Sequence, residues 1–156
     1  MLALDIPGHK EILLAHLVLD YNGTLACDGE LIGGVAERLA KLSGLLKIHV
    51  VTADTFGTVE SRLKHLPCRV IVLPRDGQDR LKRDFVRELG PEQTVCIGNG
   101  RNDRLMLREA AMGIAVIGSE GSAAAALAAA DVVCNGILTA LDLLDNPLRL
   151  TATLRS

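Results

Sequence analysis

Short apolar runs alternate with amphipathic stretches along most of the chain. Stretches 33–46, 56–66 and 79–89 repeat apolar residues every three or four positions, as helices do. The runs between them are rich in Val, Ile and Leu, and they predict strands at 16–20, 47–52, 69–73, 93–97, 113–117 and 131–134. This alternation predicts an α/β domain in three layers, with a mostly parallel sheet covered by helices on both faces.

Each predicted helix has an apolar stripe that can cover the sheet. The stripes consist of Val35, Leu39, Leu42 and Leu46 in 33–46, of Phe56, Val59, Leu63 and Leu66 in 56–66, and of Leu81, Phe85 and Leu89 in 79–89. The last of these helices has a charged face that contains Asp79, Arg80, Lys82, Arg83 and Arg87. Segment 122–130 is nearly all alanine, a strong helix former whose short side chain permits close packing.

The two ends of the chain are less regular. Residues 1–15 predict a hairpin that turns at Pro7 and Gly8, ahead of the first core strand. The tail 148–155 alternates apolar and polar residues as a strand does, yet Asn146 and Pro147 are equally typical of a helix start. Both structures remain open for the tail. No repeat or linker divides the chain, so a single domain over 1–156 is expected.

Composition limits the classes of partner. The chain has 17 basic and 19 acidic residues and only 2% aromatic residues, which argues against nucleic acid and anionic lipid as partners. No run approaches the roughly 18 to 20 apolar residues of a membrane span. The four cysteines (Cys27, Cys68, Cys96 and Cys134) have no metal-site spacing and are expected to be free thiols. We therefore expect a soluble, cytoplasmic protein.

Polar residues stand at the carboxyl ends of three predicted strands, where ligands of such sheets collect. Asp20 ends the first of them, and Thr52, followed by Ala53 and Asp54, ends the next. The third is followed by the loop 98–103, whose Asn99 and Asp103 offer oxygen ligands suited to Mg²⁺. Thr52 could equally cap a helix, and glycine turns rich in Asn are common without any function.

Lys82 is a candidate cation for this group, because it could neutralise phosphate charge. Most charges on such a helix face are simply solvated. Position alone does not choose among Arg80, Lys82 and Arg83.

Four segments together resemble the motifs of the haloacid dehalogenase superfamily, especially the phosphorylation domain of P-type ATPases. They are Asp-Tyr-Asn-Gly-Thr at 20–24, Thr-Ala-Asp at 52–54, Lys82, and Gly-Asn-Gly-Arg-Asn-Asp at 98–103. The resemblance extends over about residues 16 to 140. It implies a Rossmann-like fold and a phosphohydrolase or phosphotransferase, and it favours Lys82 over its basic neighbours.

The resemblance also implies roles for individual residues. Asp20 would be the nucleophile that forms an aspartyl-phosphate, and Asp20, the carbonyl of Asn22, Asn99 and Asp103 would surround Mg²⁺. The phosphoryl group would be bound by Gly23, Thr24, Thr52, Ala53 and Lys82. Asp54, Gly100 and Asn102 would support this site.

Two residues depart from the family pattern. Asn22 stands where phosphatases of the superfamily have an aspartic acid as general acid and base, and an amide cannot shuttle a proton near neutral pH. About 10²- to 10⁴-fold of proton-transfer assistance could be missing. Asn99 stands where the family usually has an acidic residue beside the metal. Both changes predict slow hydrolysis.

The spacing of the motifs leaves no room for an inserted cap domain. The 32 positions from Asp20 to Thr52 and the 30 from Thr52 to Lys82 are filled by the predicted elements. The site should therefore be open to a macromolecular phosphoester or to a small substrate enclosed by another subunit, and with 49% hydrophobic residues a homo-oligomer is conceivable.

Two alternatives to an enzyme follow from the same residues. One is a phosphate-binding or regulatory module that does not hydrolyse. The other is a receiver-type signalling domain, which also orders an Asp, a Thr and a Lys along an α/β chain. The second fits poorly, because the only acidic residues ahead of Asp20 are the separated Asp5 and Glu11.

Overall fold

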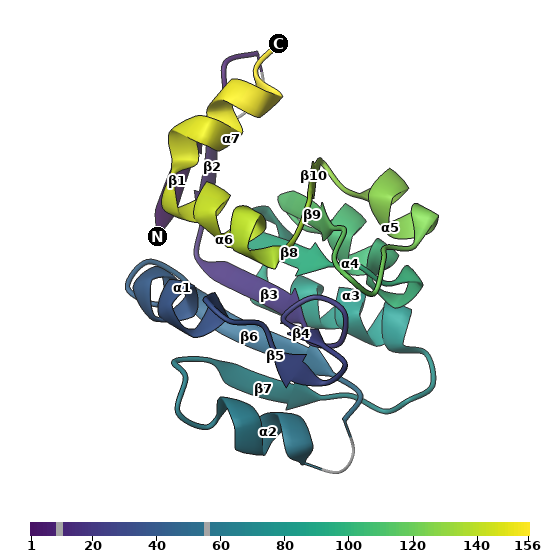
Figure 1. Ribbon diagram of the computed structural model, residues 1–156. Coiled ribbons are helices and arrows are strands. Elements are labelled where there is room, and N and C mark those ends of the chain that lie inside the picture. Colours follow the sequence, from purple (N-terminus) through teal and green to yellow (C-terminus); the bar gives the residue numbers. More distant parts are fainter. Residues whose placement is uncertain (9–10, 55–56) are drawn as a thin grey trace.

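A parallel sheet forms the centre of the protein in the computed structural model, which describes residues 1–8, 11–54 and 57–156 (Figure 1). In these residues the sheet has six strands in the order β10-β9-β8-β3-β6-β7, and all neighbours are parallel. The strands are β3 (His16–Asp20), β6 (Lys47–Thr52), β7 (Arg69–Val72), β8 (Thr94–Gly98), β9 (Met112–Val116) and β10 (Val132–Cys134). All six predicted strands are confirmed, with ends that differ by at most one residue.

Helices cover both faces of this sheet, so the predicted three layers are confirmed. One face holds α1 (Val35–Leu42), α2 (Thr58–Leu63) and α6 (Ile137–Asp145), and the other holds α3 (Gln78–Leu89), α4 (Arg104–Glu109) and α5 (Ala124–Ala129). Successive residues of a strand point to opposite faces. Leu17 and Leu19 of β3 accordingly belong to the larger apolar core, and Val18 belongs to the smaller one.

The sequence misjudged which face of α3 is buried. Leu81, Phe85 and Leu89 are only half-buried, whereas Lys82 and Val86 are fully buried. The helix is turned so that the Lys82 ammonium reaches two carboxylates, and this outweighs the burial of a more apolar stripe. In the other two stripes, Val35, Leu39, Leu42, Leu46, Val59 and Leu63 are buried and Leu66 is half-buried, while Phe56 lies outside the described residues.

The two ends of the chain pack against each other. Strands β1 (Leu2–Asp5) and β2 (Glu11–Leu14) form the predicted antiparallel hairpin. The tail is helical, as α7 (Pro147–Leu154), and the strand alternative is wrong. Pro147 begins this helix, Leu150 is buried, and the Thr151 hydroxyl donates to the Asp5 carbonyl at 3.0 Å. Packing on the hairpin thus selects the helix.

Several short elements have no counterpart in the sequence prediction. They are the small hairpin of β4 (Ala26–Cys27) and β5 (Glu30–Leu31), helix α6, and 3₁₀ turns at Pro91–Gln93 and Arg101–Asp103. We call residues 26–31 the flap, because they follow directly on the turn after Asp20.

The four cysteines are free thiols, and in the described part of the chain no helix is long and apolar enough to cross a bilayer.

Candidate active site

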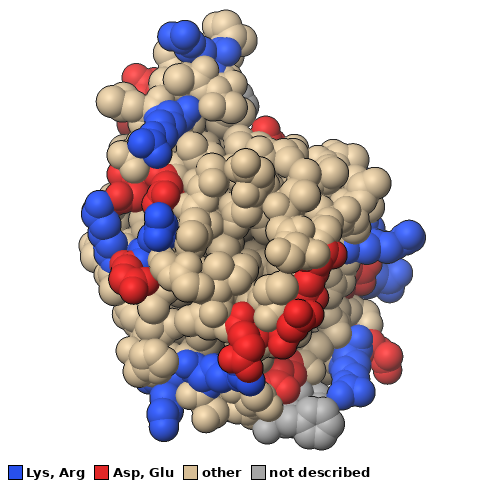
Figure 2. Space-filling model, viewed as in Figure 1, with Lys and Arg blue, Asp and Glu red and all other residues tan. Residues whose placement is uncertain are grey.

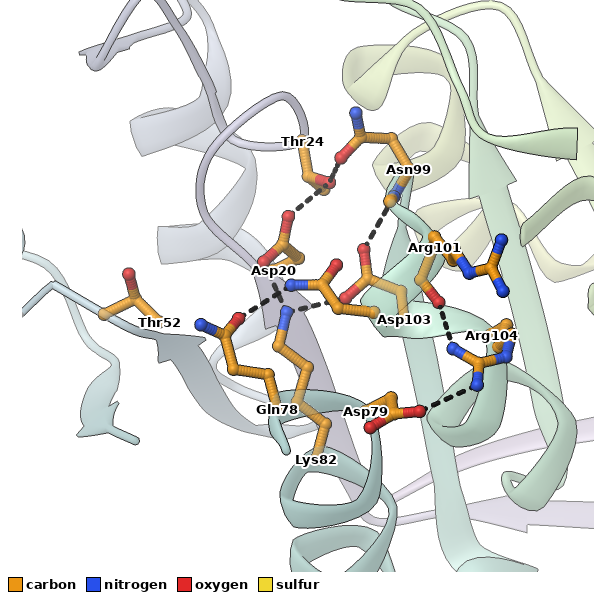
Figure 3. A network of polar contacts seen from close by, with 12 residues as sticks. Asp20, Thr24, Thr52, Gln78, Asp79, Lys82, Asn99, Arg101, Asp103 and Arg104 are labelled. Carbon is orange, nitrogen blue, oxygen red and sulfur yellow. Dashed lines mark hydrogen bonds and ion pairs between the residues drawn. The ribbon is translucent and has the colours of Figure 1, made fainter. Parts of the chain in front are cut away.

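Asp20 ends the central strand β3, between β6 and β8, where the polar residues of three strands meet. Its side chain is bonded to Lys82, whose Nζ lies 2.6 Å from Asp20 Oδ1 and 2.7 Å from Asp103 Oδ1 (Figure 3). Lys82 and Asp103 are fully buried, whereas Asp20 keeps 7% of its surface exposed. The nucleophile candidate is therefore the one member of this trio that a ligand can reach.

Lys82, and not Arg80 or Arg83, occupies the position beside Asp20. Arg80 is exposed, and Arg83 donates to the carboxylate of Asp84 next to it in the chain at 2.8 Å and 3.0 Å. The helical period explains the difference, because Lys82 and Val86 share the face that is turned to the sheet.

The buried trio shifts the titration of its members. Burial and the nearby Asp103 carboxylate raise the pKa of Asp20 to about 7, although Lys82 opposes this shift. Burial by itself lowers the pKa of Lys82, but the charges and hydrogen bonds of Asp20 and Asp103 outweigh burial, and the net shift is upward. Lys82 is therefore a fixed positive charge, while Asp20 can change its protonation state near neutral pH.

Asp103 is held by the loop that follows β8. Its Oδ2 accepts hydrogen bonds from the backbone N–H groups of Asn99, at 3.1 Å, and Gly100, at 2.9 Å. A Cβ at Gly98 would lie 2.5 Å from Asp103 Oδ2, so the loop needs glycine there. With Lys82 on its other oxygen, Asp103 is a fully bonded anchor for Lys82 and the loop.

Thr24 connects Asp20 to Asn99. Its hydroxyl lies 3.3 Å from Asp20 Oδ2 and 3.1 Å from Asn99 Oδ1, and it can donate to either oxygen. The Asn99 amide donates in turn to the Gly121 carbonyl at 3.1 Å. Gly23, with φ of 76°, lies so close to Asn99 that a Cβ would meet its side chain. The turn after β3 and the loop after β8 are therefore packed directly together.

Thr52 lies on the other side of Asp20 from Asn99, at the end of β6 (Figure 3). It is buried, its Oγ1 accepts from the Asp54 backbone N–H at 3.2 Å, and its hydroxyl hydrogen has no acceptor among the described residues. Asp54 accepts from the Val59 N–H at 2.7 Å and so stabilises the start of α2. Ala53 and Asp54 line a cavity of about 370 Å³.

Asn22 lies apart from the buried trio. Its side chain is exposed, and it lines the cavity of Ala53 and Asp54 together with Arg62 and Arg75. Arg62 donates to the Gly29 carbonyl at 2.8 Å and pairs with Glu30 at 2.6 Å. The flap is thereby fastened beside Asn22.

The sequence missed two contributors to this region. Gln78 accepts from the Asn102 amide at 2.8 Å, and the Tyr21 hydroxyl donates to the Gly29 carbonyl at 3.0 Å. Tyr21 is next to Asp20 in the chain, and Gln78 is one helical turn before Lys82, so proximity to the motifs was the signal available for each.

Solved structures that superpose on most of this chain identify the fold. The cobalt-bound deoxy-D-mannose-octulosonate 8-phosphate phosphatase of Haemophilus influenzae superposes with a TM-score of 0.70 at 17% identity, over 90% of this chain and 91% of that one. The chain has the haloacid dehalogenase (HAD)-like fold. The corresponding enzyme of Moraxella catarrhalis, solved with magnesium, phosphate and KDO, gives a TM-score of 0.64 at 20% identity, over 91% of this chain and 94% of that one.

Sequence comparisons assign this HAD-like chain to a narrower family. It belongs to one family with the uncharacterised protein MJ0073 of Methanocaldococcus jannaschii, which is 41% identical over 76 residues, or 49% of this chain and 82% of that protein. The cadmium, zinc and cobalt-transporting ATPase of Bacillus subtilis is 29% identical over 136 residues, which cover 83% of this chain and 19% of the transporter. No protein-family model matches the chain.

The donors around Asp20 have the chemistry of a hard-metal site with reduced charge. Asp20, Asn99 and Asp103 offer oxygen atoms, which divalent ions such as Mg²⁺ prefer. Asn99 is neutral, and the described residues contain no group of three or more His, Cys, Asp or Glu side chains arranged for a metal. The two carboxylates and Lys82 sum to one negative charge, so these residues fit a divalent ion that is weakly held.

Proposed function

We propose that the protein is a phosphohydrolase or phosphotransferase that forms an aspartyl-phosphate on Asp20. The observation that carries this proposal is the contact of a slightly exposed carboxylate with a fully buried ammonium, at 2.6 Å, at the carboxyl end of the central strand. Lys82 favours the ionised form of Asp20, and the ionised form is the nucleophile.

In the first step an Asp20 oxygen bonds to phosphorus as the bond from phosphorus to the leaving oxygen breaks. In the second step a water oxygen bonds to phosphorus, the bond to Asp20 breaks, and phosphate leaves. An acceptor hydroxyl in place of water would give phosphoryl transfer. Charge on the phosphoryl oxygens is the main quantity to stabilise in both steps.

Lys82, the hydroxyls of Thr24 and Thr52, and the backbone N–H group of Ala53 would bind the phosphoryl oxygens. The Gly23 N–H already donates to the Ala26 carbonyl at 2.9 Å, so Gly23 would contribute through the conformation of the turn. The positions of the two threonines support this assignment, because Thr24 contacts Asp20 directly and Thr52 lies on the neighbouring strand with a hydroxyl hydrogen that has no acceptor among the described residues. These donors are fixed by the folded chain, so little reorganisation accompanies the reaction.

Asp20, the Asn22 carbonyl, Asn99 and Asp103 would hold a divalent cation, for which we propose Mg²⁺. A bound cation supplies positive charge beside the phosphoryl oxygens. Asp103 would contribute with both of its oxygens already bonded to Lys82 and to the backbone. We therefore expect weak Mg²⁺ binding.

The amide of Asn22 predicts slow turnover of substrates that have basic leaving groups. An amide cannot protonate the departing oxygen, so a leaving group must depart as an anion or take its proton from water. Acyl phosphates and activated esters such as p-nitrophenyl phosphate tolerate this, whereas alkyl phosphates do not. The leaving group should therefore control the rate more strongly than in an enzyme with aspartic acid at this position.

The decisive experiment measures p-nitrophenyl phosphate hydrolysis at high Mg²⁺ in the wild type and in Asp20→Asn, which keeps the shape of the side chain. We expect measurable turnover that falls by at least about 10³-fold in the variant, since the nucleophile is removed. Asp142→Asn is the matched control, because Asp142 is bonded to Arg38 on the surface. A wild type inactive on a broad panel of phosphoesters and acyl phosphates would contradict the proposal.

A second candidate is a phosphate-binding module that does not hydrolyse. The neutral side chains at positions 22 and 99 favour it, because they remove both the general acid and one metal carboxylate. Such a module would bind beryllium fluoride at Asp20 with Mg²⁺ and release no phosphate. If Asn22→Asp then conferred hydrolysis, the lack of proton transfer would be the difference between this binding module and an active phosphohydrolase.

A further inference from the structure

A second cavity, of about 500 Å³, opens at the same edge of the sheet, beyond the carboxyl ends of β9 and β10. Three segments form it, namely 116–120 after β9, 135–139 at the start of α6, and part of the turn and flap after Asp20. Its volume lies in the range of small-molecule sites. Gly23 and Thr24 line it on the side of Asp20, so it is adjacent to the phosphoryl site and separated from it by this turn.

The walls of this cavity are tied to one another. The Asp28 backbone N–H donates to the Glu120 carboxylate at 3.3 Å, which connects the flap to the loop after β9. The Ile117 N–H donates to the Cys134 carbonyl at 2.9 Å, which connects that loop to β10. These bonds hold the three segments together in the folded chain, so the cavity is a preformed hollow.

The lining combines apolar side chains with uncharged polar groups. Ile32, Val116, Ile137 and Leu138 supply the apolar surface, and Ser119, Asn135 and Thr139 supply hydroxyl and amide groups. Glu120 is the one charged side chain among its described lining residues. The 370 Å³ cavity on the other side of the flap is lined by Arg62 and Arg75, so of these two cavities it is the one with cationic side chains in its lining.

The surface around the cavity has the same character. In Figure 2 uncharged residues cover α5 and β10, and acidic side chains gather where Figure 1 shows β4 and β5. A negatively charged ligand would meet the Glu120 carboxylate without a compensating cation. A hydroxyl group suits the lining better, because it can donate to Glu120 or Asn135 and accept from Ser119 or a backbone N–H.

We propose that this cavity is a binding site for an uncharged small molecule with an apolar body and at least one hydroxyl group. The site lies on the other side of the turn at Gly23 and Thr24 from the phosphoryl site at Asp20. This assignment rests on the volume, the mixed lining and the single acidic side chain, and does not depend on the proposed enzymatic activity.

Two probes of similar size test this proposal, cyclohexylmethanol and cyclohexanecarboxylate, which share the apolar ring and differ in charge. Each is titrated into the whole ¹⁵N-labelled protein while the amide signals of Gly118 and Gly136, which line the cavity, are followed by NMR. We expect the alcohol to shift both signals and to bind about fivefold more tightly than the carboxylate, as expected for one carboxylate in a solvent-accessible site. No shift at either glycine with the alcohol would overturn the proposal.

Glu120→Gln tests whether the charge of Glu120 causes the preference for the alcohol over the carboxylate probe. In this variant the carboxylate probe should bind about as well as the alcohol, whereas Glu88→Gln, a substitution of an exposed residue on α3, should keep the preference of the wild type. An unchanged preference in Glu120→Gln would show that Glu120 does not select the ligand. Saturating inorganic phosphate should leave the affinity for the alcohol unchanged, and displacement would place the probe at Asp20 instead.

Discussion

Strand β3 has a polar cluster at each end, and the two clusters differ in charge. At the carboxyl end Asp20 and Asp103 share the Lys82 ammonium, with distances of 2.6 Å and 2.7 Å. At the amino end His16 Nδ1 lies 3.1 Å from His49 Nε2, and the Phe85 ring packs edge-on against His49. The cluster at the carboxyl end therefore contains charged side chains, whereas the cluster at the amino end is a pair of imidazoles.

Burial acts on both clusters in the direction that disfavours charge. It raises the pKa of Asp20 to about 7, and it lowers the pKa of His49 to about 4. Lys82 resists the change at Asp20, whereas the His pair has no carboxylate among its described contacts and His49 Nδ1 has no hydrogen-bond partner there. The ion pair therefore includes a slightly exposed carboxylate, whereas the imidazole pair packs against the Phe85 ring.

The largest expected effect is a loss of stability when Lys82, the cation at the carboxyl end of β3, is replaced. Lys82→Met should destabilise the protein by about 3–5 kcal/mol, because it leaves the fully buried Asp103 without its counter-charge. Urea unfolding measures this value. Arg83→Met is the matched control on the same helix, and it should change the free energy of unfolding by less than about 1 kcal/mol because the Arg83–Asp84 pair is largely at the surface. Equal stability of the two variants would show that Lys82 does not stabilise Asp103.

The role of Lys82 also shows how far the sequence could predict the site. Periodicity assigned Lys82 to the charged face of its helix, because Leu81, Phe85 and Leu89 form the more apolar stripe. Its burial depends on Asp20 and Asp103, which lie 62 and 21 positions away in the chain, and no local pattern contains that information. Only the resemblance of the motifs to a family singled it out.

The fold was more accessible to prediction than the small elements around the site. Six strands and the hairpin follow from apolar runs and turn residues, since buried parallel strands leave a strong local signal. The flap strands of two residues each are too short for any period. The tail 148–155 satisfied both a strand and a helix pattern, and contact with the hairpin near Asp5 decided between them.

A smaller effect is expected on the affinity for Mg²⁺ at the carboxyl end of β3. Asn99→Asp adds a carboxylate beside Asp20 and Asp103, which raises the negative charge of the donor set from one to two. We expect Mg²⁺ to bind about tenfold more tightly, which corresponds to about 1.4 kcal/mol. The Mg²⁺ dependence of the melting temperature measures this without requiring activity. Asn135→Asp, at the separate cavity, should leave the Mg²⁺ midpoint unchanged, and an equal shift in both variants would argue against a metal site at Asn99.

The remaining comparison distinguishes the two ends of β3 by the sign of their response to pH. The unfolded pKa of histidine is near 6.5 and the folded pKa of His49 is about 4, so the unfolded state binds more protons between these values. The stabilisation due to neutral His49 is complete above pH 6.5 and is lost as the pH falls towards 4. Asp20 behaves oppositely, because its pKa rises from 3.8 to about 7 on folding, and its contribution is lost as the pH rises through that range.

Two variants separate these opposing contributions. Between pH 7 and pH 4.5, the difference in unfolding free energy between wild type and His49→Leu should fall by about 1 kcal/mol or more, whereas the difference between wild type and Asp20→Asn should rise. His65→Leu, at an exposed histidine, is the matched control for the loss of an imidazole. If both main differences changed in the same direction, the two ends of β3 would not differ in how burial treats their charge. Opposite slopes would show that folding raises the pKa of Asp20 at one end of β3 and lowers the pKa of His49 beside the other end.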